Sequence, residues 1–366
     1  MALTAGIVGL PNVGKSTLFN AITQAGAEMA NYPFATIEPN VGMVEVPDVR
    51  LDRIAEIENS KKVVPTTFEF TDIAGIVKGA SQGEGLGNKF LENIRQVDAI
   101  VHVVRAFEDG DITHVSGKVD PLDDIETINT ELILADLESI NNRYAKLERQ
   151  ARGNDKEIKA EFAVVSKIKP VLEEGKSVRT IEFSDDEQKY VKGLFLLTSK
   201  PILYVANVSE ADMANPENSP LYKQVKEFAE SENAEVIGLS ARMEEEISEM
   251  DDADKKDFLE MQGVDEPGLN KLIRAAYHLL GLRTFFTAGE KESRAWTFKD
   301  GTKAPQAAGI IHTDFERGFI RAETMSFDDL NEYGSQKAVK EAGKLRSEGK
   351  EYVVKDGDIM EFLFNV

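Results

Sequence analysis

Short apolar runs recur along the first two thirds of the chain, and segments with helical spacing of hydrophobic positions separate them. The runs fall at residues 3–8, 67–71, 99–104, 201–206 and 235–239. Runs that are apolar at nearly every position are typical of parallel strands buried on both faces. Helical patterns lie between several of them, at residues 16–24, 86–95 and 221–231. This alternation predicts an α/β fold built on a doubly wound sheet.

A long insertion, residues 121–199, interrupts this alternation. Its first half carries apolar residues at steps of four and three, which is a heptad seam: Ile133, Leu137, Ile140, Tyr144 and Leu147. After a polar break at 153–155, a second apolar stripe follows: Ile158, Phe162, Val165 and Leu172. We expect an antiparallel coiled-coil hairpin that projects from the sheet domain. The alternative is that both helices pack on the core. Residues 184–187 read as a capping box that begins a further helix.

The pattern changes again near residue 281. Strand-like segments lie at 284–287, 295–298, 318–322 and 352–354, and a helix-like segment at 337–348. Three lysines of that segment, Lys337, Lys340 and Lys344, fall roughly on one predicted helix face. A Lys-rich face is usually solvated, and contact with an RNA is the alternative. We therefore expect a nucleotide-binding domain from 1–120 and 200–280, a helical insertion at 121–199, and a small α+β domain at 281–366.

Composition narrows the possible functions. The 366 residues include no cysteine and carry a formal net charge of −22. The missing cysteines exclude disulfides, zinc fingers and thiol catalysis. The negative charge argues against broad electrostatic binding to nucleic acid, so DNA is not an expected partner. No run approaches the roughly 18 apolar residues of a membrane span, and no basic leader is visible, so we expect a cytoplasmic protein without membrane contact.

The chemistry begins with Gly9-x4-Gly14-Lys15-Ser16, a P-loop between the first strand and the first helix. Its glycines let successive backbone N–H groups turn toward a phosphate, and Lys15 adds charge for the β- and γ-phosphates. The Ser16 hydroxyl suits a Mg²⁺ ion. The residues expected to hold the nucleotide are Asn12, Val13, Gly14, Lys15, Ser16 and Thr17. Lys15 is also the first catalytic candidate.

A second element supports this interpretation. Asp72 and Gly75 form Asp-x-x-Gly at the end of a predicted strand, where P-loop enzymes hold Mg²⁺ and meet the γ-phosphate. The glycine-rich segment 75–87 reads as a nucleotide-dependent switch, or alternatively as an ordinary flexible loop. Thr36 is a candidate for the second Mg²⁺ hydroxyl because it lies between the P-loop and Asp72.

The predicted base site departs from that of GTP-binding domains, which usually carry Asn-Lys-x-Asp. This chain has Asn207-Val208-Ser209-Glu210. The longer carboxylate of Glu210 cannot meet the two guanine donors in the same geometry, whereas backbone carbonyls can read the amino group of adenine. Residues Ser240, Ala241 and Arg242 fit the loop that closes over the base. We predict ATP over GTP, and the alternative is that residues 207–210 form only a strand-end turn.

Many small GTPases place a water-orienting Gln directly after Asp-x-x-Gly. This chain has Ile76 there, so turnover should be slow unless another group acts. His114 is a candidate because an imidazole can accept a proton from water near neutral pH, although it could equally bond a loop carbonyl. His102 lies in mid-strand and reads as a core residue. The side-chain carbonyl of Asn12 is a candidate ligand for a monovalent cation such as K⁺.

Taken together, residues 12–17, 72–75, 83–87 and 207–210 resemble the Obg-like ATPases, the YchF subfamily of translation-factor-related P-loop NTPases. The resemblance runs from Met1 to Val366, and its C-terminal segment looks like a TGS domain with a β-grasp fold. It implies a Ras-like, Obg-type nucleotide-binding domain and Mg²⁺-dependent ATP hydrolysis. It also implies association with the ribosome or its large subunit. The alternatives are a GTP-binding protein with a degenerate base site and a nucleotide-gated scaffold in which hydrolysis is incidental.

Overall fold

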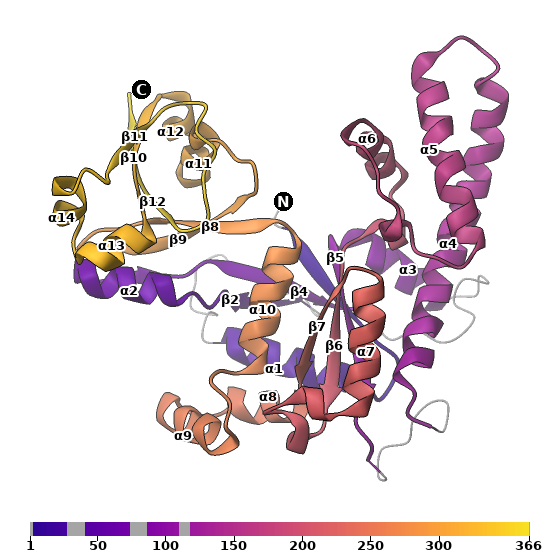
Figure 1. Cartoon of the computed structure of the whole chain (residues 1–366), viewed down its shortest axis with the longest axis horizontal. Helices are drawn as coiled ribbons and strands as arrows, with labels where there is room; N and C mark the ends of the chain where they lie inside the picture. Colours follow the sequence, from indigo (N-terminus) through magenta and orange to yellow (C-terminus); the bar gives the residue numbers. More distant parts are fainter. Residues whose placement is uncertain (1–2, 28–40, 74–85, 110–117, 366) are drawn as a thin grey trace. The chain divides into compact units, whose positions relative to one another are not determined.

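The computed structural model describes residues 3–27, 41–73, 86–109 and 118–365 (Figure 1). The chain forms two compact units. The first contains residues 1–44 and 69–272, and the second contains residues 45–68 and 273–366. No helix in the described ranges combines the length and the apolar character that crossing a membrane requires.

The first unit is built on a six-stranded sheet with the strand order β2-β4-β1-β5-β6-β7. Its strands are β1 (Thr4–Val8), β2 (Val41–Glu45), β4 (Thr67–Asp72), β5 (Ala99–Ala106), β6 (Ile202–Val208) and β7 (Glu235–Leu239). Strands β4, β1, β5, β6 and β7 pair in parallel. Every residue of β5 and β6 is buried, as their mostly apolar sequences predict, and the buried set includes the polar His102, Arg105 and Asn207.

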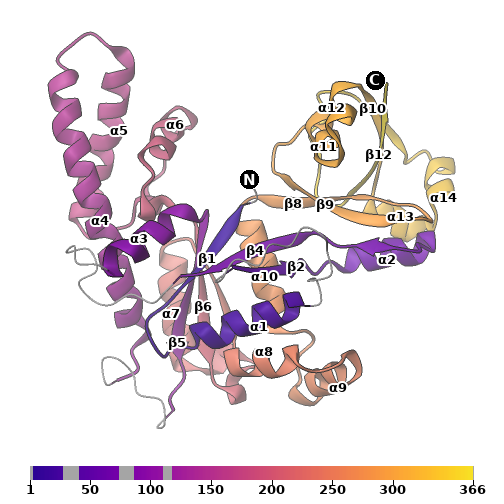
Figure 2. The ribbon, with the colours of Figure 1, turned by 180° about the vertical axis from the view of Figure 1, so that it is seen from behind.

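Helices cover this sheet on both sides. Helix α7 (Pro220–Ser231) lies over the face seen in Figure 1, and α1 (Lys15–Ala27) and α3 (Leu86–Gln96) lie over the face seen in Figure 2. Helices α8 (Ala241–Ser248), α9 (Asp252–Gln262) and α10 (Gly268–Leu279) follow the last strand. The α/β prediction with a doubly wound sheet is therefore confirmed.

A helical hairpin leaves this unit between β5 and β6. Helix α4 (Pro121–Gln150) runs antiparallel to α5 (Lys156–Glu173), and α6 (Asp185–Leu194) begins with the predicted Ser184 capping box. The seam residues of both helices form one hydrophobic cluster. The expected projecting hairpin is present, since α5 and the end of α4 extend together away from the sheet. Helix α4 also contacts β5 and α7, and its first turns bury Ile125, Ile128 and Leu132.

Asp136 fixes the point where the hairpin leaves the core. Its fully buried carboxylate accepts hydrogen bonds from the backbone N–H groups of Leu197 and Thr198, both at 2.8 Å, and from the Thr198 hydroxyl at 2.7 Å. Residues 197–199 form a short 3₁₀ helix, η4, just before β6. The carboxylate therefore joins the middle of α4 to the segment by which the chain returns to the sheet.

The second unit contains a mixed sheet with the strand order β11-β10-β12-β8-β9-β3. Its strands are β3 (Val63–Val64), β8 (Leu282–Thr287), β9 (Ser293–Lys299), β10 (Phe319–Ser326), β11 (Arg346–Glu348) and β12 (Asp358–Phe364). Its helices are α2 (Val49–Glu58), α11 (Ala304–Ile311), α12 (Thr313–Arg317), α13 (Phe327–Tyr333) and α14 (Gln336–Glu341). One cluster around Phe285 and Phe298 and another around Phe286 and Leu330 form its core.

Residues 45–68 belong to this second unit, although the sequence analysis groups them with the nucleotide-binding domain. Strand β3 pairs in parallel with β9 at the edge of the sheet. Leu51 and Ile54 of α2 are buried in the same cluster as Phe286. The apolar face of α2 packs against residues more than 200 positions further along the chain. The local sequence pattern therefore could not predict that this helix belongs to the second unit.

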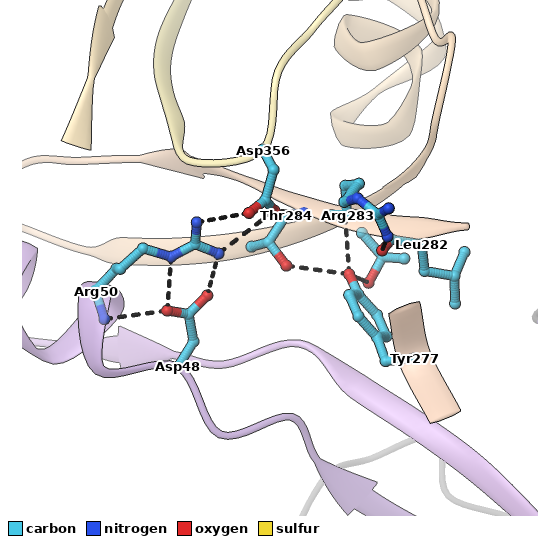
Figure 3. A network of polar contacts seen from close by, with 8 residues as sticks. Asp48, Arg50, Tyr277, Leu282, Arg283, Thr284 and Asp356 are labelled. Atoms are coloured by element: carbon cyan, nitrogen blue, oxygen red, sulfur yellow. Dashed lines mark hydrogen bonds and ion pairs between the residues drawn. The ribbon is translucent and has the colours of Figure 1, made fainter. Parts of the chain in front are cut away.

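An arginine network secures this segment (Figure 3). The Arg50 guanidinium donates to both carboxylate oxygens of Asp48, at 2.9 and 2.8 Å, and to Asp356 at 2.7 Å. Asp356 also accepts from the backbone N–H of Thr284 at 2.9 Å. Burial alone would raise the pKa of Asp356, but the Arg50 and Thr284 donors outweigh it and lower that pKa. The network therefore connects the start of α2 to β8 and to the loop before β12.

Two predictions in the second unit are wrong. The helix expected at 337–348 ends at Glu341, because Gly343 takes a left-handed φ of 72° and residues 346–348 form β11. Lys344 therefore lies beyond the helix that carries Lys337 and Lys340, and its Nζ lies 3.8 Å from Asp329. Residues 352–354 contribute only a single bridge, between Val353 and Lys303, and the final strand is β12.

His102 gives the first unit a specific acid sensitivity. The ring is 1% exposed, lies 5.5 Å from the Tyr204 ring, and has no hydrogen-bond partner among the described residues. Burial, and secondarily the charge of Arg179, lowers the pKa of His102 to about 3. Since the unfolded chain binds this proton near pH 6.5, the contribution to stability is complete above that pH. It is lost as the pH falls toward 3.

We predict that lowering the pH from 7.5 to 5.0 removes about 2 kcal/mol of stability through His102 alone. His102→Phe preserves an aromatic ring beside Tyr204 and removes the titrating group. Denaturant unfolding of both proteins at both pH values measures the difference, since other titrating groups contribute equally to each. The same loss of stability in wild type and variant would contradict the prediction.

Candidate nucleotide-binding site

The predicted site residues converge at one edge of the first sheet. Parallel strands end at the same edge, and Ile7 of β1 lies beside Asp72 of β4, while Asn207 of β6 lies beside Leu239 of β7. The loops that follow β1, β6 and β7 contain the P-loop, Glu210 and Ser240. The carboxyl edge of a parallel sheet is where α/β proteins usually bind ligands. The topology therefore brings together segments that lie more than 200 residues apart.

The P-loop has the backbone conformation that its sequence predicts. Asn12 and Gly14 both have positive φ, at 63° and 93°. Alternation of this kind turns backbone N–H groups toward a common concavity. The Gly14 carbonyl accepts from the Leu18 N–H at 2.9 Å, so α1 begins directly behind the loop. A Cβ atom at Gly14 would lie 2.2 Å from the Asn207 amide nitrogen, so only glycine fits there.

Lys15 and Asp72 form an ion pair at the base of this loop. Their side chains are only 11% and 20% exposed, so the pair is largely shielded from water. Ser16 follows in the first turn of α1 and is exposed, and Thr17 is half-buried. The Ser16 hydroxyl and the Asp72 carboxylate, which contacts the neighbouring Lys15, are hard oxygen donors of the kind that Mg²⁺ prefers. The described residues therefore fit the expected metal.

Asn207 connects two of the converging loops. Its amide nitrogen donates to the Val13 carbonyl at 2.9 Å, and its amide oxygen accepts from the Ala241 N–H at 2.9 Å. The residue is 5% exposed. We predicted Asn207 as a residue that binds the nucleotide. In the structure it joins the P-loop to the loop after β7, so its contacts are those of a positioning residue.

The predicted base-reading residues lie at the rim. Val208 is the buried last residue of β6, and Glu210 begins a short 3₁₀ helix, η5, capped by Ser209. The Arg242 Nε lies 3.5 Å from a Glu210 carboxylate oxygen and 3.3 Å from one of Glu246. Ser240 and Ala241 are buried just behind Arg242. Glu210 and Arg242 are therefore close to each other and accessible, with opposite charges.

Three predicted site residues, Thr36, Gly75 and His114, lie outside the described residues. Ile76 and most of the predicted switch, at 75–85, lie outside them as well. Their roles in metal binding, phosphate binding and water activation stay predictions.

Arg105 is a positioning residue that the sequence analysis misses. It is the largest fully buried side chain among the described residues and stands beside Asn207 in the sheet register. Its guanidinium donates to the carbonyls of Phe107 at 3.1 Å and Asp109 at 3.3 Å, and it stacks 4.6 Å above the Phe107 ring. Arg105 thus holds the segment that leads toward residue 110. The sequence signal for this role is an arginine near the end of a mostly apolar strand.

Two family models match this chain. One, described as a 50S ribosome-binding GTPase, matches residues 4–145, and the other, described as a protein of unknown function (DUF933), matches residues 282–365. Full-length relatives are also similar. The ribosome-binding ATPase YchF of Bacillus subtilis is 64% identical, and that of Escherichia coli O157:H7 is 56% identical, each match covering 100% of both chains.

A solved structure titled as the YchF GTPase of Schizosaccharomyces pombe superimposes with a TM-score of 0.88 at 41% identity. The match covers 99% of this chain and 97% of that one. The names of these relatives specify different nucleotides. The bacterial proteins are named ATPases, and the yeast protein is named a GTPase.

The contacts of Asn207 give a direct test of the site. We expect Asn207→Asp to keep the acceptor for the Ala241 N–H but to place a carboxylate oxygen against the Val13 carbonyl. An unmade buried hydrogen bond costs about 1–3 kcal/mol, and where this cost falls on the phosphate-binding conformation of the P-loop, binding of a nucleoside triphosphate should weaken by up to roughly 5- to 150-fold. Calorimetric titration measures the affinity. Asn215→Asp, an exposed change of equal charge in the same unit, is the control, and unchanged affinity in Asn207→Asp would contradict the prediction.

Proposed function

This chain belongs to the YchF family, and from that premise we propose that it is a ribosome-associated ATPase that binds ATP with Mg²⁺ and hydrolyses it slowly. The observation that carries the proposal is the contact of Lys15 with Asp72 beside a P-loop that Asn207 holds in place. These residues supply the charge and the hard ligands that phosphoryl transfer needs.

Each residue has a distinct part in this proposal. The backbone N–H groups of residues 12–17 surround the β-phosphate, and Lys15 stabilises negative charge on the β- and γ-phosphates. Ser16, Thr36 and Asp72 hold Mg²⁺ directly or through water, and Mg²⁺ supplies charge neutralisation when bound. Since Lys15 contacts Asp72, the lysine must exchange a carboxylate partner for phosphate when ATP binds.

Slow turnover follows from the residue after Gly75. Ile76 cannot orient an attacking water, so the chain lacks the usual glutamine at this position. We keep His114 as the candidate that accepts a proton from this water. Asn12 is kept as the candidate for binding K⁺ beside the phosphates. Rates of ATP hydrolysis test both candidates. A wild-type rate in His114→Ala would exclude His114 as the proton acceptor. Equal rates in Na⁺ and K⁺ buffers would leave the role of Asn12 in K⁺ binding without support.

The preference for adenine rests on the position of Glu210. Its carboxylate is paired with Arg242 at 3.5 Å and is one methylene longer than the aspartate of guanine-binding sites. That length and partner disfavour the two parallel hydrogen bonds that guanine requires. Adenine presents no donor to this carboxylate, and backbone carbonyls near Ser240 can accept from its amino group. A GTP-binding protein with a degenerate base site is the alternative, and the GTPase names of two of the matches favour it.

Ribosome association comes from the relatives, which are named ribosome-binding ATPases. We further propose that residues 281–366 form a TGS domain and that the protein acts in the cytoplasm. The mixed sheet with β8 and β12 pairing in parallel supports the β-grasp assignment. In the alternative scaffold function, nucleotide would gate ribosome binding and hydrolysis would be incidental.

Turnover of ATP with and without ribosomes tests the proposal. We expect wild-type protein alone to hydrolyse ATP at roughly 10⁻⁴–10⁻² per second, as P-loop enzymes do without an activating partner. Ribosomes should raise this rate. Lys15→Met should lower it about a hundredfold or more, because it removes the charge that stabilises the transition state, and Lys15→Arg is the matched control that keeps charge. Absence of wild-type hydrolysis under both conditions, or full activity in Lys15→Met, would contradict the assignment.

A further inference from the structure

The free end of the helical hairpin carries an exposed group of basic residues. It comprises Lys146 and Arg149 of α4, Arg152 of the turn, and Lys156 and Lys159 of α5. We call these five residues the hairpin tip. Figures 1 and 2 both draw this turn as the far end of the hairpin, away from the sheet of its unit. The rest of the protein is strongly acidic, with a net charge of −22 over the whole chain.

Within the part of the chain that the structure describes, none of the five cations of the hairpin tip lies in an ion pair. One helical turn closer to the sheet, by contrast, Arg143 pairs with Glu161 at 2.5 Å. Nearby carboxylates are mostly engaged elsewhere. Asp155 caps α5 by accepting from the N–H groups of residues 157 and 158, and Glu157 accepts from the Tyr190 hydroxyl at 2.6 Å. Glu148 is the one remaining carboxylate between residues 146 and 159.

Helix stability explains the position of Arg149 but not the positions of Lys156 and Lys159. Arg149 lies in the last turn of α4, where the helix dipole favours a cation. Lys156 is the first residue of α5 and Lys159 lies in its first turn, where the same dipole disfavours positive charge. Residues that lower the stability of their own helix are expected mainly at functional positions.

The hairpin also holds this group of charges in place. Leu147, Val164 and Val165 are buried in the seam, and the Tyr144 and Phe162 rings lie 5.1 Å apart. The buried Asp136 joins the base of the hairpin to the core. The five cations are therefore presented on a packed arm and not on a flexible tail, which limits the entropy lost when they bind.

We infer that the hairpin tip binds the phosphate backbone of ribosomal RNA. This inference identifies the contact surface for the ribosome association proposed above, and it rests on that proposal. Charge complementarity carries the inference. A polyanion repels the acidic body of the protein and attracts the tip, so the approach is oriented with the hairpin first. Lysine and arginine without internal partners are the groups that release counterions from RNA.

The experiment compares four forms of the full chain by sedimentation with purified ribosomes. The tip variant combines Lys146→Gln, Arg149→Gln and Lys159→Gln. A matched control combines Lys223→Gln, Lys256→Gln and Lys291→Gln, which are exposed lysines without ion pairs elsewhere in the described chain. A charge-conserving variant combines Lys146→Arg, Arg149→Lys and Lys159→Arg. Affinity is measured between about 50 and 200 mM KCl, and then again with protein-free ribosomal RNA.

We expect the tip variant to bind at least tenfold more weakly than the control near 100 mM KCl, and its salt slope to fall by about 2–3. The charge-conserving variant should bind like wild type, and protein-free RNA should give the same ranking. Equal affinity of tip variant and control overturns the inference while leaving ribosome association intact. A loss of affinity seen with intact ribosomes but absent with RNA also overturns it, because the target is then a protein surface.

Failure of the proposed function has a different signature. If wild-type protein binds neither ribosomes nor RNA but still hydrolyses ATP, ribosome association itself is wrong, and the role of the hairpin tip is overturned with it. Basal ATP turnover in the tip variant should equal that of wild type, since the tip lies outside the P-loop and the base site. That equality also verifies that the variant is folded.

Discussion

The geometry of the nucleotide site depends on the two hydrogen bonds of Asn207. One holds the Val13 carbonyl and the other the Ala241 N–H, both at 2.9 Å, from a side chain that is almost wholly buried. The P-loop holds Asn12 in a left-handed backbone conformation that residues with a Cβ adopt uncommonly, and surrounding contacts have to maintain it. The same asparagine fixes the start of α8, whose Arg242 pairs with Glu210, so the P-loop and the proposed base site share one support.

A second constraint is the division of the chain. Residues 45–68 leave the first unit, complete the sheet of the second with β3, and return along β4 to Asp72. The Arg50 network and the burial of Leu51 and Ile54 hold this segment with sequences beyond residue 273. The predicted metal ligands Thr36 and Asp72 therefore lie on either side of a segment that belongs to another folding unit.

Sequence predicts best what is local. The five strands of the parallel sheet, the P-loop, the hairpin seam and the Ser184 capping box follow from residues within one or two turns of each other. Three features could not be predicted in this way, because each depends on partners that are distant in the sequence and close only in the fold. They are the hydrogen bonds of Asn207, the burial of Arg105 and the place of residues 45–68 in the second unit. The helix predicted at 337–348 fails for a different reason, since the left-handed turn at Gly343 outweighs an otherwise helical pattern.

The central claim is that the geometry around Glu210 and Arg242 selects adenine at a phosphate site common to ATPases and GTPases. Relatives named as ATPases and as GTPases make the choice of nucleotide the most informative property to measure. Equilibrium titration of wild-type protein with ATP and with GTP, each with Mg²⁺, tests it most directly. Tighter binding of ATP is the predicted result, and tighter binding of GTP would contradict the account.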